Sequence, residues 1–149
     1  EEVYQNPQDI RVAEFIGSPK MNMLPGQCDE FGHITCAGLS LDGLLAKPAP
    51  GPVSVGLRPE HLTLTDAGAA QSLSGKLTYK ENLGSDVFFH LMQGGNESAI
   101  IIRAQPLAAT PQKPGDTLHC VPVPGKPLVF GTDGRRLDFK AATNFDKLA

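Results

Sequence analysis

The chain has 149 residues, 40% of them hydrophobic, which is enough for one domain or two small lobes with a real core. Its formal net charge is −3 and its 13 Lys and Arg residues are scattered, which argues against the basic stripe that nucleic-acid binding requires. No apolar run approaches the roughly 20 residues that span a bilayer, and the first residues lack the basic and apolar segments of a signal peptide.

One amphipathic helix is predicted, near the start of the chain. Asn6 can cap it, Pro7 suits its first position and Gly17 suits its end. Between them, apolar residues recur at three-residue spacing from Ile10 to Ile16. Because so short a helix is marginal alone in water, we expect its apolar face to dock on another part of the protein.

After this helix the pattern changes to short extended runs separated by many of the 16 Gly and 13 Pro residues. That pattern is typical of short strands joined by turns. The predicted strands are 21–24, 31–37, 39–41, 53–58, 75–83, 86–93, 98–104, 117–121 and 128–131. A stiff Pro-rich connector over 47–52 and a looser segment over 66–72 separate them into groups. The sequence thus predicts a mostly β fold that fits two small five-stranded barrels of the OB type.

The segment 86–93 is apolar on both of its faces. Alternate positions place Val87, Phe89 and Leu91 on one face and Phe88, His90 and Met92 on the other. This composition favours a central strand or a barrel wall. The residues 93–96, Gln-Gly-Gly-Asn, have the composition of a hairpin turn that leads into the strand over 98–104.

Residues that carry catalysis or bind phosphate are not grouped in any recognisable motif. The two Gly-Lys pairs, at 75–76 and 125–126, are not followed by Ser or Thr, so neither is a phosphate-binding loop. The adjacent Asp29 and Glu30 are expected on a solvated turn rather than in a catalytic pair. We therefore expect no catalytic site, no cofactor site and no enzyme activity in this segment.

Histidines and cysteines are likewise spaced too widely for a metal site. The histidines His33, His61, His90 and His119 are expected to be strand-surface or hydrogen-bonded core residues. The cysteines Cys28, Cys36 and Cys120 contain no CxxC pair and are interpreted as reduced thiols of a cytosolic protein.

The block Arg58-Pro59-Glu60-His61 interrupts an apolar strand and has two interpretations. In the structural one, Pro59 starts a single helical turn, Glu60 lies near its positive end, and Arg58 bonds a carboxylate that fixes the turn. In the functional one, the turn is a contact point for a partner chain. Arg–carboxylate bonds serve both purposes. Of the two interpretations, residue chemistry favours the structural one.

Several motifs, in order along the chain, carry a resemblance to a known family. The stretch Tyr4-Gln5-Asn6-Pro7, followed by Phe15-Ile16-Gly17-Ser18-Pro19 and Asn22, is one, and the block from Val55 to His61 is another. Residues 75–103 and the turn 130–137 add further similarity. Together they resemble the C-terminal region of the ATP-binding subunits of carbohydrate ABC importers of the maltose and glycerol-phosphate type.

The resemblance implies a fold and a role. It implies two intertwined OB-like lobes, a TOBE region, over residues 18–149, and a last helix of a nucleotide-binding domain over residues 1–17. The expected function is regulation and dimerisation of an importer ATPase, with ATP and Mg²⁺ bound elsewhere in the full-length parent. The expected partners are a second copy or a paralogous ATPase subunit, the permease subunits and a regulatory protein, at the cytoplasmic face of the bacterial inner membrane.

The sequence leaves two alternative functions. The first is an OB-like domain that senses an oxyanion or small ligand, which would need convergent Ser, Thr and backbone donors at an interface. The second is a single-strand nucleic-acid protein, which would need stacking aromatic residues and a positive groove. The chain has no Trp, only two Tyr and an acidic balance, which speaks against the second.

Overall fold

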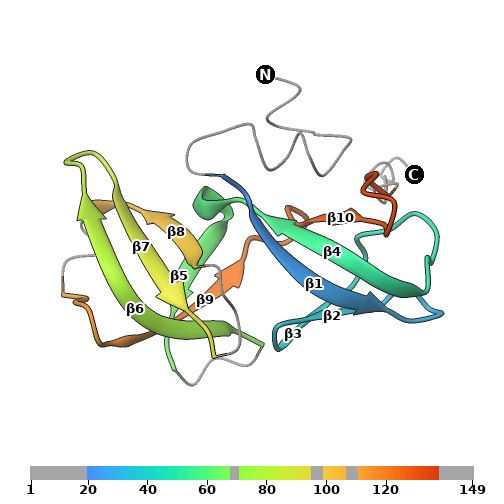
Figure 1. Ribbon diagram of the computed structural model, residues 1–149, viewed down its shortest axis with the longest axis horizontal. Helices are drawn as coiled ribbons and strands as arrows, with labels where there is room; N and C mark the ends of the chain where they lie inside the picture. Colours follow the sequence, from blue (N-terminus) through green and yellow to red (C-terminus); the bar gives the residue numbers. More distant parts are fainter. Residues whose placement is uncertain (1–19, 68–70, 95–98, 107–110, 138–149) are drawn as a thin grey trace, which may run out of the picture. The chain divides into compact units, whose positions relative to one another are not determined.

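The computed structural model describes residues 20–67, 71–94, 99–106 and 111–137, and these residues form ten strands and one short helix (Figure 1). The elements are β1 (Asn22–Cys28), β2 (Ile34–Cys36), β3 (Leu39–Leu41), β4 (Gly51–Leu57), the 3₁₀ helix η1 (Pro59–His61), β5 (Leu62–Thr65), β6 (Leu73–Asn82), β7 (Val87–Met92), β8 (Ile100–Ala104), β9 (Thr117–Pro122) and β10 (Leu128–Phe130). The predicted mostly β fold is confirmed. The helix predicted over 6–17 lies outside the described residues.

The chain forms two compact units, and it passes from the first to the second and back. Of the described residues, unit 1 contains 20–56 and 127–137, whereas unit 2 contains those between Leu57 and Lys126. Each unit is built on one five-stranded sheet, in the order β10-β4-β1-β2-β3 for the first and β5-β9-β6-β7-β8 for the second. The expected pair of intertwined lobes is therefore confirmed.

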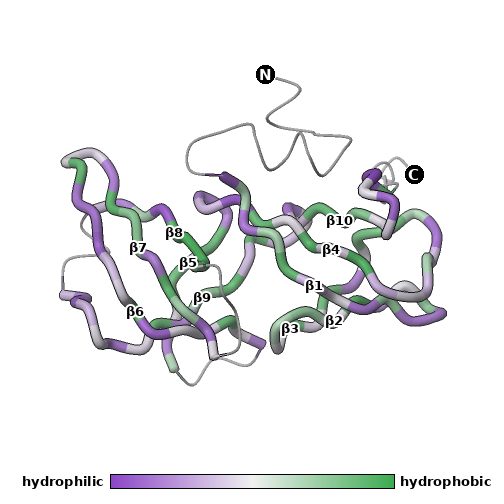
Figure 2. The backbone as a smooth tube through the Cα atoms, viewed as in Figure 1, coloured by the Kyte–Doolittle hydropathy of each residue, from purple (hydrophilic) through white to green (hydrophobic). Residues whose placement is uncertain are grey.

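Unit 1 depends on a strand that returns from the far end of the described chain. Strand β10 pairs antiparallel with β4, so that Val129 lies opposite Val55. All three residues of β10 are buried, and Phe130 packs in a cluster with Met21 and Leu128. Figure 2 shows the hydrophobic stretches of β4 and β10 that supply this side of the core. The other side comes from buried residues of β1, β2 and β3.

The hairpin between β1 and β2 is shaped by one aspartate. The carboxylate of Asp29 accepts hydrogen bonds from the backbone N–H groups of Phe31 at 2.8 Å and His33 at 2.9 Å. This is the local bonding that makes Asp a turn residue. The Phe31 side chain at the tip is 71% exposed. The predicted solvated turn at Asp29 and Glu30 is confirmed.

Unit 2 curves until the two ends of its sheet approach each other. Strands β5 and β8 are the outermost strands, and they nevertheless contact one another, while η1 packs against β8. Close packing inside the barrel requires glycine at one point, since a Cβ at Gly75 would lie 3.0 Å from the Leu91 Cβ and from the Met92 carbonyl oxygen. The core side chains are Leu62, Leu73, Leu77, Val87, Phe89, Leu91, Ile100, Ile102, Leu118 and Cys120.

Two strand predictions were incomplete, for identifiable reasons. Strand β5 was missed because its four residues directly follow the η1 turn and precede the loose segment over 66–72. Strand β1 extends past Pro25, where the prediction had stopped. Proline lacks a backbone donor and normally limits a strand. Here its side chain is exposed, and the pairing of β1 with β2 involves only Gln27 and Cys28, beyond the proline.

Core packing in unit 1 can be tested with two phenylalanines that differ in burial. We expect Phe130→Ala to lower the free energy of unfolding by about 3–5 kcal/mol, because it empties a fully buried ring site. The matched change Phe31→Ala, at an exposed ring of the same unit, should stay within about 0.5 kcal/mol. Urea denaturation measures both, and equal losses for the two variants would contradict the core described above.

Candidate functional site

The Arg58–His61 block forms the turn that the sequence predicted. Pro59 occupies the first position of η1, Glu60 lies in its first turn, and Arg58 precedes it in extended conformation. The His61 N–H donates to the Arg58 carbonyl at 2.9 Å, and the Leu62 N–H donates to the Pro59 carbonyl. Proline suits this position because its fixed φ matches the helix and its missing N–H is not needed there.

Two residues of this turn are held inside unit 2. The Arg58 side chain is only 5% exposed, and a buried charge requires compensating polar contacts. The predicted bond from Arg58 to a carboxylate stays a prediction. The His61 carbonyl accepts a hydrogen bond from the Val123 N–H at 2.9 Å, which ties η1 to the residue after β9. The turn is therefore part of the framework of the barrel.

The His61 ring differs from the expectation of a fully hydrogen-bonded histidine. Its Nδ1 atom is buried and has no hydrogen-bond partner among the described residues. Burial lowers the pKa of His61, and the neighbouring Glu60 carboxylate opposes this effect only in part. Since this partial burial disfavours the cationic form, His61 is neutral in the folded protein near neutral pH.

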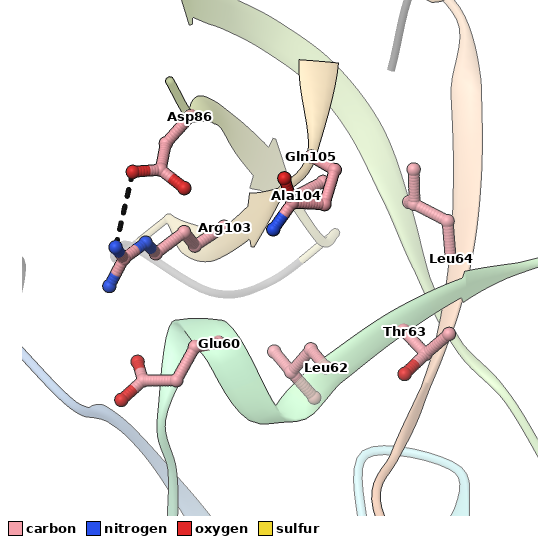
Figure 3. A pocket seen from close by; sticks show the side chains of 8 residues that line it. All are labelled: Glu60, Leu62, Thr63, Leu64, Asp86, Arg103, Ala104 and Gln105. Atoms are coloured by element: carbon pink, nitrogen blue, oxygen red, sulfur yellow. Dashed lines mark hydrogen bonds and ion pairs between the residues drawn. The ribbon is translucent and has the colours of Figure 1, made fainter. Parts of the chain in front are cut away.

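A pocket of about 400 Å³ opens beside the turn (Figure 3). Its lining comes from η1, from β5, from β8 with the residue that follows it, and from the residue before β7: Glu60, Leu62, Thr63, Leu64, Asp86, Arg103, Ala104 and Gln105. Figure 3 shows the charged ends of Glu60, Asp86 and Arg103 gathered at one side, with the β5 side chains at the other. The turn thus lies where the two outermost strands of the barrel face each other.

The pocket's charges are partly neutralised by one ion pair. Arg103 Nη2 donates to Asp86 Oδ2 at 3.1 Å. This hydrogen bond lowers the pKa of the Asp86 carboxyl below its usual value. With Glu60 as a second carboxylate, the pocket carries two acidic groups against one guanidinium. Such a charge balance is unfavourable for an oxyanion, and the lining contains no nucleophile paired with a base.

The other expected site residues divide into described and undescribed ones. Asn22 begins β1, and its side chain is buried. The remaining junction residues, Phe15, Ile16, Gly17, Ser18 and Pro19, lie outside the described residues. Within the described ranges no three His, Cys, Asp or Glu side chains are grouped closely enough to hold a metal ion, and no helix is long and apolar enough to cross a membrane.

The three cysteines are free thiols in the cores of the units. Burial raises the pKa of Cys36 to about 11 and that of Cys120 to about 12. A thiol reacts and binds metals as its thiolate, so these two side chains are chemically inert at neutral pH. Their free, buried state agrees with the interpretation of reduced structural thiols.

Sequence reasoning missed Asp86 and Arg103 as members of the site. One signal was available, because a hairpin between the predicted strands 86–93 and 98–104 brings the start of one beside the end of the other. In the structure Phe88 pairs with Arg103, which places the arginine near Asp86. The exact register depends on the turn between the strands, and a one-residue shift would have moved Arg103 to the opposite face.

The Asp86–Arg103 pair can be tested by titration. We expect Arg103→Gln to raise the pKa of Asp86 toward the usual range of an aspartate, because the charged hydrogen bond is lost. Carboxyl NMR during acid titration measures the change. The control Lys113→Gln removes another cation of unit 2 that lies beside an aspartate, Asp116, and should leave Asp86 unchanged. An unchanged Asp86 pKa in Arg103→Gln would refute the pairing.

The half-buried His61 ring should make stability depend on pH. The folded-state pKa of His61 is lowered from 6.5, so the unfolded chain binds this proton more readily. Its stabilising contribution is complete above pH 6.5 and is lost as the pH falls through the folded-state pKa. We expect the unfolding free energy of the wild type, relative to His61→Gln, to decrease on acidification. Denaturant titrations at several pH values measure this difference, and a constant difference would contradict the assignment.

Two family models match the chain in succession. Residues 17–62 match the model described as the MalK OB fold domain, and residues 55–130 match the model described as the TOBE domain. The Arg58–His61 turn lies in the overlap of the two matches.

Curated relatives match nearly the whole chain. The sn-glycerol-3-phosphate import ATP-binding protein UgpC of Paracoccus denitrificans is 36% identical over 141 residues, covering 92% of this chain and 38% of the relative. The UgpC of Bordetella pertussis is 36% identical over 144 residues, covering 92% and 39%. The UgpC of Yersinia pestis is 34% identical over 142 residues, covering 92% and 38%. The chain therefore spans well under half the length of these relatives.

A solved structure shares the fold. The molybdate-bound form of the cytoplasmic molybdate-binding protein ModG aligns with a TM-score of 0.58 and 16% identity, covering 73% of this chain and 94% of that chain. At this identity the likeness concerns the fold alone. The matches to relatives confirm the resemblance drawn from the motifs. Since the TOBE model alone spans more than half of the residues, the chain belongs to the TOBE domain family.

Proposed function

We propose that this chain is the C-terminal regulatory and dimerisation region of the ATP-binding subunit of a bacterial ABC importer for sugars or glycerol phosphate. The observation that carries the proposal is the agreement of two independent matches. An OB fold domain and a TOBE domain follow one another along the chain, and importer ATP-binding proteins match 92% of it. Those relatives are more than twice as long as the matched region, which leaves room in them for an ATPase domain.

Each part of the chain has a role in this proposal. We propose that residues 1–17 belong to the end of the nucleotide-binding domain and that residues 18–149 are the accessory region. The junction motif Phe15-Ile16-Gly17-Ser18-Pro19 connects the two, and the buried Asn22 helps to fix the first strand after it. ATP and Mg²⁺ are bound by the ATPase domain of the intact subunit, so this region itself is not an enzyme.

Rigidity is the physical property that suits the described region to this role. A region that holds two subunits together while their ATPase domains open and close must keep its own shape. Each unit has a five-stranded sheet with buried apolar side chains, and the framework of unit 2 includes the buried Arg58 and the tied η1 turn. Close-packed interiors deform little, so contacts made on such a surface keep their geometry.

The proposed partners follow from the same role. The intact subunit works at the cytoplasmic face of the inner membrane, where its ATPase domain contacts the permease subunits. This region pairs with a second copy of itself or with a paralogous ATPase subunit. The half-buried Glu60, which lines the pocket at the Arg58–His61 turn, is the proposed contact for a regulatory protein.

The alternative function, sensing an oxyanion, receives no support from the described pocket. ModG is a molybdate-binding protein, but its likeness to this chain extends to the fold only. Two carboxylates line the pocket, and its one guanidinium already bonds Asp86. Repulsion from the carboxylates would weaken the binding of an anion there.

The proposed function can be tested with a chimeric subunit. The matching region of Paracoccus denitrificans UgpC is replaced by this chain, and uptake of radiolabelled glycerol 3-phosphate is measured in cells that lack their own UgpC. We expect the chimera to restore uptake. Two controls are a UgpC cut before the region and a chimera that carries ModG, which has the same fold but 16% identity to this chain.

Neither control should restore uptake at comparable expression. A chimera that is soluble and hydrolyses ATP but supports no uptake would refute the proposed function. Uptake by the ModG chimera would also refute it, because the fold alone would then suffice.

A further inference from the structure

Strand β7 has a second apolar face besides the one in the core. It is a central strand of unit 2, between β6 and β8. Its residues alternate between buried and half-buried, with Val87, Phe89 and Leu91 inside the barrel. The outward residues Phe88 and His90 keep part of their surface exposed. Polar residues normally occupy the solvated face of such a sheet, so an apolar outer face indicates a contact surface.

The neighbouring strands extend this face on both sides. Directly across from His90 lie Tyr79 on β6 and Ile101 on β8. A register shift between Leu77 and Tyr79 brings the tyrosine, rather than Thr78, opposite His90. The two rings are in edge contact, with centroids 5.1 Å apart. Nevertheless Tyr79 is 54% exposed, so a large aromatic surface faces outward.

Cross-strand neighbours on β6, β7 and β8 form rows across the sheet. In the row next to that of His90 on the same face, the residues on the two flanking strands carry opposite charges. Phe88 lies between Glu81 on β6 and Arg103 on β8. Arg103 bonds Asp86 through one nitrogen, and its side chain remains 43% exposed. A guanidinium has five N–H donors in a planar fork, a geometry that suits contacts with carboxylates. We call the six residues of these two rows, Tyr79, Glu81, Phe88, His90, Ile101 and Arg103, the outer face.

We infer that the outer face pairs with the same face of a second copy, around a two-fold axis parallel to β7. This inference rests on the proposed function, in which two copies pair. Such an axis reverses each row, so Glu81 of one copy meets Arg103 of the other, and the reverse contact forms as well. Phe88 meets Phe88, and Tyr79 meets Ile101. Packed sheets lie about 10 Å apart, a distance that a glutamate and an arginine span together.

The outer face is complementary to itself, and this property favours a second copy of the chain as its partner. A two-fold interface joins one patch to itself, so each charge must find its opposite within that patch. The outer face satisfies this condition, because it has one acid and one base at opposite ends of a row and apolar residues between them. An apolar centre with charged residues at its rim is also the usual composition of a protein interface.

Light scattering of the 149-residue chain over a concentration series tests the inference. We expect a dimer that dissociates on dilution. Phe88→Glu should raise the dissociation constant about 10-fold or more, since it places a charge at the centre of the interface. The matched control Phe31→Glu makes the same change at an exposed ring of unit 1 and should leave it unchanged. A wild type that is monomeric throughout, or a dimer that tolerates Phe88→Glu, would overturn the inference.

A second variant separates loss of pairing from loss of folding. Phe88 is half-buried, so its replacement by glutamate also strains the barrel. Tyr79 is more exposed, and Tyr79→Glu should weaken the dimer while the melting temperature of the dilute monomer stays within a few degrees of the wild type. A folded Tyr79→Glu protein with unchanged dimerisation would count against the outer face.

Charge reversal tests the register of the two copies. Glu81→Arg and Arg103→Glu should each dimerise poorly, because like charges then meet across the axis. Mixed together, they should form a heterodimer, since both acid–base contacts are restored. A mixture that associates no better than its components would exclude this arrangement.

These outcomes are independent of the uptake assay. A chimera that restores uptake, combined with a chain that does not pair through the outer face, would overturn this inference and leave the proposed function standing.

Discussion

The pairing of β10 with β4 is the contact on which the two-unit architecture depends. Residues 128–130 return to residues 54–56, and the whole of unit 2 lies between them in the sequence. Without this pairing β4 would lose its partner on one side, and the cluster around Phe130 would lose its centre. The same pairing fixes both ends of the inserted segment to unit 1. Unit 2 is therefore connected to unit 1 through the chain at both of its ends.

Within unit 2, strand β7 links the core to the surface features. Its inner residues fill the barrel, its outer residues form the centre of the outer face, and Asp86 just before it contributes to the pocket. One strand therefore sets the position of two surfaces at once. A change of register on β7 would exchange its inner and outer residues and disrupt both.

Much of the fold was predictable, because local signals decide it. Alternating apolar runs and turn residues located nine of the ten described strands, and Pro59 identified the η1 turn. Non-local contacts were not predictable in this way. The return of β10 to β4, the Asp86–Arg103 pair and the unpaired Nδ1 of His61 depend on residues far apart in the sequence. The family was accessible through motifs, whereas the candidate site required coordinates.

Because unit 2 is inserted between the strands of unit 1, it also determines the order in which the strands emerge during translation. Translation releases every strand of unit 2 before β10, so the second barrel is able to close while unit 1 is still incomplete. During that interval β4, which contains Val53 and Val55, presents an unpaired edge, the kind of edge that can pair with strands from other chains. This edge of β4 therefore stays open from the emergence of β4 until β10 has been synthesised.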